Sequence, residues 1–173
     1  MGPTTINGLP AHVLFVHIVV VMVPLTALLL VLSVLWPAAR RRLGVITPVA
    51  ALVTLVSVPL TTNAGEWLEH NTARDPLIRA HAHLGDQMLY WSAGVFLLSA
   101  AWWAMHNEQI RRRLRRPADR STHSAASKTI AIAVAVVAVA VSLGSVVEVY
   151  RIGDSGAKAV WHDRVDSVGS ADQ

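Results

Sequence analysis

Histidine and carboxylate side chains recur at one distance from the ends of four apolar segments. They are His17, nineteen residues before Trp36; His83, twenty before Trp103; Glu66, twenty-two after Gly44; and Glu148, twenty after Lys128. A helix needs about 20 residues to cross about 30 Å of hydrocarbon, so the spacing predicts that these four groups lie at one depth, near one membrane face. Ionisable groups are costly to bury at that depth and mark functional sites. Imidazole nitrogens ligate haem iron, and imidazole together with carboxylate suits divalent metals.

Two of these positions have a second histidine close by on the same segment. His12 and His17 are five residues apart, about 140° around a helix, so one ligand is not expected to engage both. His81 and His83 are two apart and face nearly opposite sides of a helix, so at most one of them faces a bundle interior. The depth count favours His83, and a shift of one helical turn favours His81. All four histidines are candidates for cofactor binding.

The carboxylates allow two interpretations. Glu66 and His70 are four residues apart, which puts them on one helix face at a spacing that suits a metal ion. Glu148 follows a long run of apolar and small residues and precedes Arg151 by one helical turn. It is either a further metal ligand or the partner of Arg151 in an ion pair at the membrane edge.

The elements that must position these groups are four membrane-spanning helices. Of the 173 residues, 53% are hydrophobic and 15% are charged, against about 25% charged in soluble domains. The helices are predicted over about 11–36, 45–63, 76–106 and 129–150. The last segment alternates Ala and Val like a strand, but it is too long for one, and an open sheet edge would lack hydrogen bonds in lipid. We therefore predict an all-α, multi-pass protein of the cell membrane that forms a single four-helix bundle.

The basic residues predict the orientation of this bundle. Ten of the fifteen Lys and Arg residues fall on two alternate connections: Arg40, Arg41, Arg42, Arg111, Arg112, Arg113, Arg115, Arg116, Arg120 and Lys128. The positive-inside rule assigns both connections to the cytoplasm, so 107–128 is predicted to be a basic cytoplasmic loop. Both termini and a tail over 151–173 are then extracytoplasmic. Because this topology accounts for the basic residues, the predicted partner is the lipid bilayer and not nucleic acid.

The absence of cysteine narrows the chemistry further. Disulfides, thiolate metal sites, iron–sulfur clusters and covalently attached c-type haem are excluded within these residues. The sequence also has no serine-nucleophile motif, no glycine-rich phosphate loop and no zinc-protease pattern. Enzyme activity is therefore not expected, although the question stays open.

Two stretches resemble a known family. Residues 9–17, LPAHVLFVH, are similar to an opening His-Pro-x-x-Val-His-Phe-Pro motif, and residues 149–161, VYRIGDSGAKAVW, resemble the segment after the last helix of many members. The family is DUF2231, an uncharacterised family of bacterial four-helix membrane proteins. Val13 and Ile18 replace the Pro and Phe of the motif, whereas the histidine pair is retained at His12 and His17. The resemblance implies an inner-membrane domain, and the redox domains beside or fused to members, of Rieske type or cytochrome c type, imply electron transfer by analogy.

Three functions remain open. In the first, a b-type haem is ligated by His17 with His83 or His81, Gly94 and Gly144 make room for the macrocycle, and electrons pass to a redox membrane complex or a quinone. In the second, a divalent metal ion is held by the residues His17, His83, Glu66 and either His70 or Glu148. In the third, the polar groups pair with one another, and the chain is a structural or accessory membrane subunit without a cofactor.

Overall fold

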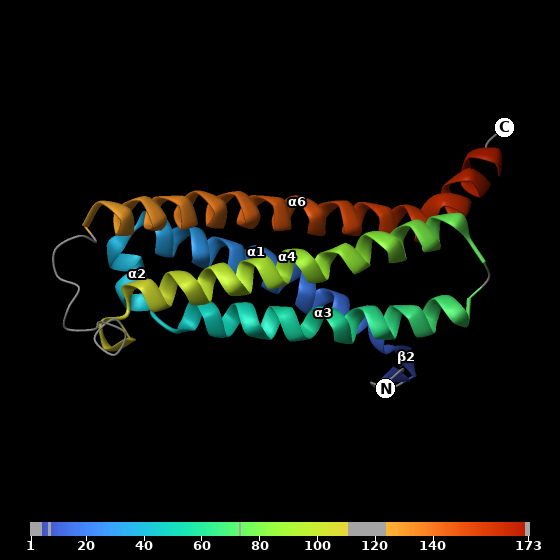
Figure 1. The fold of residues 1–173 in the computed structure, drawn as a ribbon. Coiled ribbons are helices and arrows are strands. Elements are labelled where there is room, and N and C mark those ends of the chain that lie inside the picture. Colours follow the sequence, from blue (N-terminus) through green and yellow to red (C-terminus); the bar gives the residue numbers. More distant parts are fainter. Residues whose placement is uncertain (1–4, 7, 73, 111–123, 172–173) are drawn as a thin grey trace.

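Four long helices run side by side in the computed structural model, which describes residues 5–6, 8–72, 74–110 and 124–171 (Figure 1). They are α1 (Ala11–Leu35), α3 (Ile46–His70), α4 (Pro76–His106) and α6 (Ser124–Ala171). A short helix, α2 (Pro37–Leu43), connects α1 to α3, and two antiparallel two-residue strands, β1 (Thr5–Ile6) and β2 (Leu9–Pro10), precede α1. Each long helix contains a stretch long and apolar enough to cross a membrane. The predicted all-α, multi-pass membrane fold is confirmed.

The helix ends follow local signals in the sequence. Trp36 has extended backbone angles (φ −123°, ψ 106°) because Pro37 follows it, and this break separates α1 from α2. Gly44 has φ +45°, a conformation that costs glycine little, and it turns the chain from α2 into α3. Asp75 caps α4, since its carboxylate accepts a 2.7 Å hydrogen bond from the Leu77 N–H.

Two helices are longer than the sequence predicts. α3 continues to His70 and not to 63, and α6 continues past 150, so the expected tail over 151–173 is helical as far as Ala171. Lys158 Nζ and Asp154 Oδ2, 2.7 Å apart, support the added turns of α6. The fall in hydropathy marks the place where a helix becomes polar, not the place where it ends. Most of the predicted basic loop, including the arginines from Arg111 to Arg120, lies outside the described residues.

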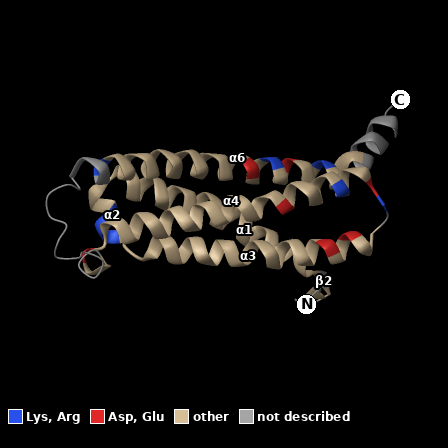
Figure 2. Cartoon of the chain, in the orientation of Figure 1, with Lys and Arg blue, Asp and Glu red and all other residues tan. Residues whose placement is uncertain are grey.

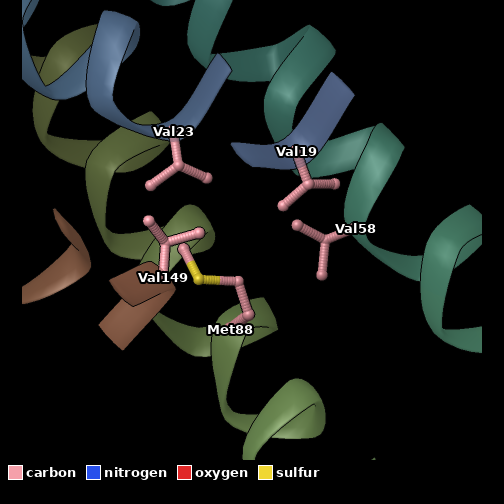
Figure 3. Packing of buried hydrophobic residues seen from close by; sticks show 5 residues of the cluster. All are labelled: Val19, Val23, Val58, Met88 and Val149. Carbon is pink, nitrogen blue, oxygen red and sulfur yellow. The ribbon is translucent and has the colours of Figure 1, made fainter. Parts of the chain in front are cut away.

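The four helices share one core. α1 and α4 each pack against both α3 and α6, which makes α1 and α4 diagonal partners in the bundle. Every helix contributes to a buried cluster, which consists of Val19, Val23, Val58, Met88 and Val149 (Figure 3). Any group that bridges α1 and α4 must therefore cross the bundle axis.

A second buried apolar cluster consists of Leu30, Ala51, Val95, Trp102 and Ala138, and small hydroxyl residues are also buried in the interior. Thr54, Ser99 and Ser142 are among those buried. Several of these hydroxyls bond a backbone carbonyl one turn earlier, as Thr54 Oγ1 does with the Ala50 oxygen at 2.9 Å. Large apolar side chains such as Leu28, which is 54% exposed, point outward instead. This distribution is typical of membrane helices that pack closely and present their large side chains to lipid.

Charge distinguishes the two ends of the bundle (Figure 2). The end that contains α2, with its three arginines, is called the arginine end. The opposite end contains the α3–α4 connection 71–75 and is called the histidine end; Glu66, Glu69 and Asp75 lie toward it. The β1–β2 hairpin and the last turns of α6 also lie at the histidine end (Figure 1). The assignment of the arginine end to the cytoplasm stays a prediction of the positive-inside rule.

Candidate functional site

Two imidazole rings meet near the axis of the bundle at the histidine end. His12 opens α1 and His81 lies in the second turn of α4, so they come from diagonally opposed helices. Their ring centroids are 6.3 Å apart and their planes are inclined by 83°. Both side chains are half-buried. The pair is called the His12–His81 site below.

Each ring is anchored to a neighbouring helix through its Nδ1 atom. His12 Nδ1 lies 3.0 Å from the backbone oxygen of Thr61 on α3. His81 Nδ1 lies 3.1 Å from the backbone oxygen of Ile152 and 3.0 Å from Ser155 Oγ, both on α6. A carbonyl oxygen can only accept, so Nδ1 must donate in both rings. In the neutral imidazole, Nε2 then carries a lone pair that can bind a metal.

Two glycines make these ring positions accessible. A Cβ atom at Gly65 on α3 would lie 3.0 Å from His12 Nδ1, and one at Gly156 on α6 would lie 3.0 Å from His81 Cε1. Those separations are tighter than ordinary contacts, so any larger residue would push against the rings. All four long helices therefore build the His12–His81 site. α1 and α4 supply the imidazoles, and α3 and α6 each supply a glycine that leaves room for a ring and a backbone carbonyl that anchors it.

The two histidines favoured by the depth count point away from this pair. His17 is exposed, and its Nδ1 lies 2.6 Å from the backbone oxygen of Val13 in its own helix. His83 is exposed as well, whereas His81 is half-buried and bonded to α6, so of the two alternatives that the sequence left open it is His81 that faces the bundle. Counting along a segment predicts the depth of a residue in the membrane but not the direction in which its side chain points. Residues two positions apart, such as His81 and His83, point about 200° apart around a helix.

The other predicted ligands are spread over the histidine end. Glu66 and His70 are exposed on α3. His70 and His83 both line a cavity of about 880 Å³ between the end of α3 and the start of α4. Within the part of the chain that the structure describes, no three His, Asp or Glu side chains converge as a metal site would require. His17 and Glu66 do not line the cavity that His70 and His83 share, so the four predicted ligands have no common site.

Glu148 is the exception, since it is 97% buried within α6. Its Oε2 accepts a hydrogen bond from Arg151 Nη1 at 2.8 Å, which is the ion pair that the sequence allowed. Its Oε1 has no hydrogen-bond partner among the described residues. The carboxylate is thus held from one side only.

The room expected for a macrocycle at Gly94 and Gly144 is occupied. A Cβ atom at Gly94 would lie 3.1 Å from Val141 Cγ1, and one at Gly144 would overlap the indole of Trp91. These glycines serve the packing of α4 against α6. A cofactor at the His12–His81 site would lie closer to the histidine end.

Residues 8–169 match the DUF2231 family of predicted membrane proteins. The chain belongs to this family. The match extends over nearly the whole length, in agreement with the motifs at 9–17 and 149–161. Comparisons with curated proteins and with solved structures gave no match. The DUF2231 assignment and the four candidate spans establish an integral membrane protein and leave its activity to be argued from the site.

In this DUF2231 member, the pairing of His12 with His81 is a feature that sequence counting missed. Both residues were candidates, but the sequence paired His17 with His83 or His81 and gave His12 no histidine partner, because spacing does not determine helix rotation. A usable signal was present in the glycines. Gly65 and Gly156 both lie near the polar ends of long helices, where glycine disfavours helix and needs a packing reason.

Proposed function

We propose that the chain is a b-type haem protein of the membrane that transfers electrons, and that His12 and His81 would hold the haem iron. The observation that carries this proposal is the pair itself: two imidazoles from diagonal helices, with centroids 6.3 Å apart and each anchored to a neighbouring helix through Nδ1. The sequence also predicted a b-type haem site, but it assigned the ligands to His17 with His83 or His81.

The number of ligands favours haem over a single divalent metal ion. A structural zinc site takes four protein ligands, and a catalytic one takes three. The described residues offer two imidazoles at this site and no converging third His, Asp or Glu. A haem macrocycle brings four nitrogens of its own, so two imidazoles complete the coordination of its iron.

The spacing and the anchors of the rings also support the proposal. His12 and His81 come from different helices, and their ring centroids are 6.3 Å apart, so both rings could contact one bound group. Metal-binding histidines usually donate their other ring N–H to a carbonyl or carboxylate, which fixes the ring and its tautomer. Thr61 and Ile152 provide such carbonyls.

Bound haem would supply reversible one-electron chemistry. The contribution of the chain would be to hold the iron from two helices and to keep both imidazoles neutral and oriented. A single site near one end of the bundle would exchange electrons at that end, with a redox membrane complex or a quinone as the predicted partner.

The experiment is a dithionite-reduced minus oxidised absorbance spectrum of the detergent-purified chain, with haem measured in the same sample. We expect Soret and α-band shifts at near-stoichiometric haem, and loss of most haem in His12→Ala and in His81→Ala. His17→Ala and His83→Ala are matched controls because they remove exposed histidines from the same two helices. Full haem occupancy in both His12→Ala and His81→Ala, or a flat spectrum after haem is supplied, would contradict the proposal.

A structural role is the second candidate, and a specific observation favours it. His12 joins α1 to α3, and His81 joins α4 to α6, through the same bonds that would orient axial ligands. His81→Asn separates the two roles, because an asparagine N–H can replace the Nδ1 donor but cannot replace the Nε2 ligand. For a haem ligand we expect unchanged thermal stability of the haem-free protein and loss of haem. A protein without haem in which His81→Ala lowers stability and His81→Asn restores it would support the structural role instead.

A further inference from the structure

A second cavity lies at the arginine end, at the opposite end of the bundle from the His12–His81 site. It has a volume of about 720 Å³ and is enclosed by α2, the last turns of α1 and α4 and the start of α3. Its lining combines cationic and aromatic side chains, chiefly Arg40, Arg41, Trp102, Trp103 and His106. The predicted haem function does not use any of these residues.

The floor of this cavity is rigidly built around Trp102. Its side chain is 6% exposed, and its indole Nε1 donates to the backbone oxygen of Ser33 at 3.1 Å. Ser33 Oγ in turn lies 3.2 Å from Thr47 Oγ1, so α1, α3 and α4 are tied together beneath the cavity. The ring of His106 packs 4.3 Å from the Trp102 ring, centroid to centroid, and its Nδ1 lies 2.9 Å from the Trp102 backbone oxygen.

The arginines above this floor have no carboxylate partner among the described residues. The guanidinium carbon of Arg40 lies 5.7 Å from the centre of the Trp102 ring, a cation–π contact that orients it without neutralising it. Two ion pairs among the described residues, Glu148–Arg151 and Asp154–Lys158, both belong to α6 at the other end. Glu108 is the acidic residue of the lining; it is exposed and has an interaction of its own.

Backbone geometry holds these charges in place. Gly44 adopts φ +45° directly after α2 and donates its N–H to the Arg40 oxygen at 3.1 Å. The resulting turn sets α2 at the end of the bundle with Arg40 half-buried, whereas Arg41 and Arg42 are exposed. At the facing wall, Asn107 Oδ1 accepts hydrogen bonds from the N–H groups of Gln109 and Ile110 at 3.0 and 3.3 Å.

We propose that this cavity binds the phosphate of an anionic phospholipid, with Arg40 and Arg41 as its ligands. Guanidinium groups match phosphate oxygens in two parallel hydrogen bonds, and an aromatic floor accommodates the glycerol and the first acyl carbons. The cavity lies where four apolar helices end, at the depth of lipid headgroups, and basic pockets between membrane helices at that depth suit acidic lipids. A lipid, rather than a free anion, is favoured because Trp103 and the outward apolar faces continue from the cavity along the helices.

The test uses the full chain in detergent, with lipid binding followed by native mass spectrometry and by thermal shift. The probes are phosphatidylglycerol, zwitterionic phosphatidylcholine and inorganic phosphate. We expect phosphatidylglycerol to bind and stabilise the protein, phosphatidylcholine to bind much more weakly, and inorganic phosphate to produce no shift at equal concentration. Equal binding of the two lipids would overturn the proposal, and so would an inorganic phosphate shift as large as that of the anionic lipid, which would indicate a free-anion site.

Arg40→Gln should weaken phosphatidylglycerol binding by about tenfold, as expected for loss of one charge-assisted hydrogen-bonding group. Arg42→Gln is the matched control, since it removes the same charge from an exposed position on the same helix outside the cavity. We expect it to change binding less than about twofold, because it leaves the proposed hydrogen bonds intact. Equal effects of the two substitutions would mean diffuse attraction to the arginine end and would contradict a built site. Arg41→Gln provides the same comparison if Arg40→Gln does not fold.

Discussion

Glu148 places a carboxylate inside a bundle whose interior is otherwise apolar or hydroxylated. Its side chain is 97% buried, and one of its oxygens depends on Arg151, whose own side chain is 56% exposed. A buried charge left without a partner costs far more than the pair contributes. Arg151 therefore offsets part of the free-energy cost of burying the Glu148 carboxylate.

Replacing Arg151 by alanine should destabilise the protein by about 1–3 kcal/mol, because the buried Glu148 carboxylate loses its hydrogen bond. The measurement is thermal unfolding in detergent. The double substitution Glu148→Gln with Arg151→Ala should recover most of the loss, since an amide carries no charge. Lys158→Ala, which removes the exposed partner of Asp154, should leave the midpoint unchanged. No recovery in the double variant would contradict this account of the pair.

At the same scale, the sequence predicted which residues belong to candidate sites better than it predicted which side chains they contact. It identified His12, His81 and Glu148 as candidates from their positions on apolar segments, and it anticipated the Glu148–Arg151 pair. The rotation of each helix decides which of two nearby histidines faces the axis, and that depends on packing against three other helices. Spacing along one segment carries no such information.

The contact between α4 and α6 depends on small residues, which is an element-scale feature of the fold. Trp91 of α4 packs directly over Gly144 of α6, and Val141 packs over Gly94 in the opposite direction. Close approach of this kind lets membrane helices gain van der Waals contact where the hydrophobic effect is weak. The glycines of α6 do not by themselves identify the helix that packs against them, and the arrangement of the bundle shows that it is α4.

Gly144→Ala should lower stability, because the new methyl group overlaps the Trp91 indole. Overpacking costs typically about 1–3 kcal/mol, more than the roughly 1 kcal/mol that alanine gains over glycine in a helix. Gly153→Ala on the same helix meets no atom within 4 Å and should be neutral or stabilising. Thermal unfolding of the two variants in the same detergent checks the contrast, and stabilisation by Gly144→Ala would refute the proposed contact.

Helix ends show what hydropathy can and cannot predict at this scale. α4 matches the expected 76–106, since Asp75 and a following proline form a strong start signal. The sequence has no helix-stop signal at 63 or 150, so α3 continues to His70 and α6 continues to Ala171. Capping chemistry defines helix boundaries, and hydropathy defines the membrane-embedded portion.

At the scale of the whole molecule, the two ends differ in charge and in proposed chemistry. The arginines of α2 lie at one end, and the His12–His81 site lies at the other (Figure 2). With an even number of spans, the two termini share one side of the membrane. The positive-inside rule predicts that this side is extracytoplasmic, so electrons would be exchanged outside and acidic lipid would bind inside.

The absence of native cysteine makes this orientation directly measurable. In intact cells, Asn71→Cys at the histidine end should react with a membrane-impermeant thiol reagent. Gln109→Cys at the arginine end should react only after the membrane is disrupted. Both residues are exposed, so accessibility within the protein does not limit labelling. The reverse labelling pattern would overturn the predicted topology without affecting the geometry of the His12–His81 site.

We propose that one haem is held by His12 and His81, which come from diagonally opposed helices of the bundle. The most direct test is electron paramagnetic resonance of the oxidised, haem-loaded protein. We predict a low-spin ferric signal in the unaltered chain, as expected for two imidazole ligands, and a change to high-spin iron or loss of haem in His12→Ala and in His81→Ala. A low-spin signal that persists in both variants would show that other residues hold the iron and would contradict the account.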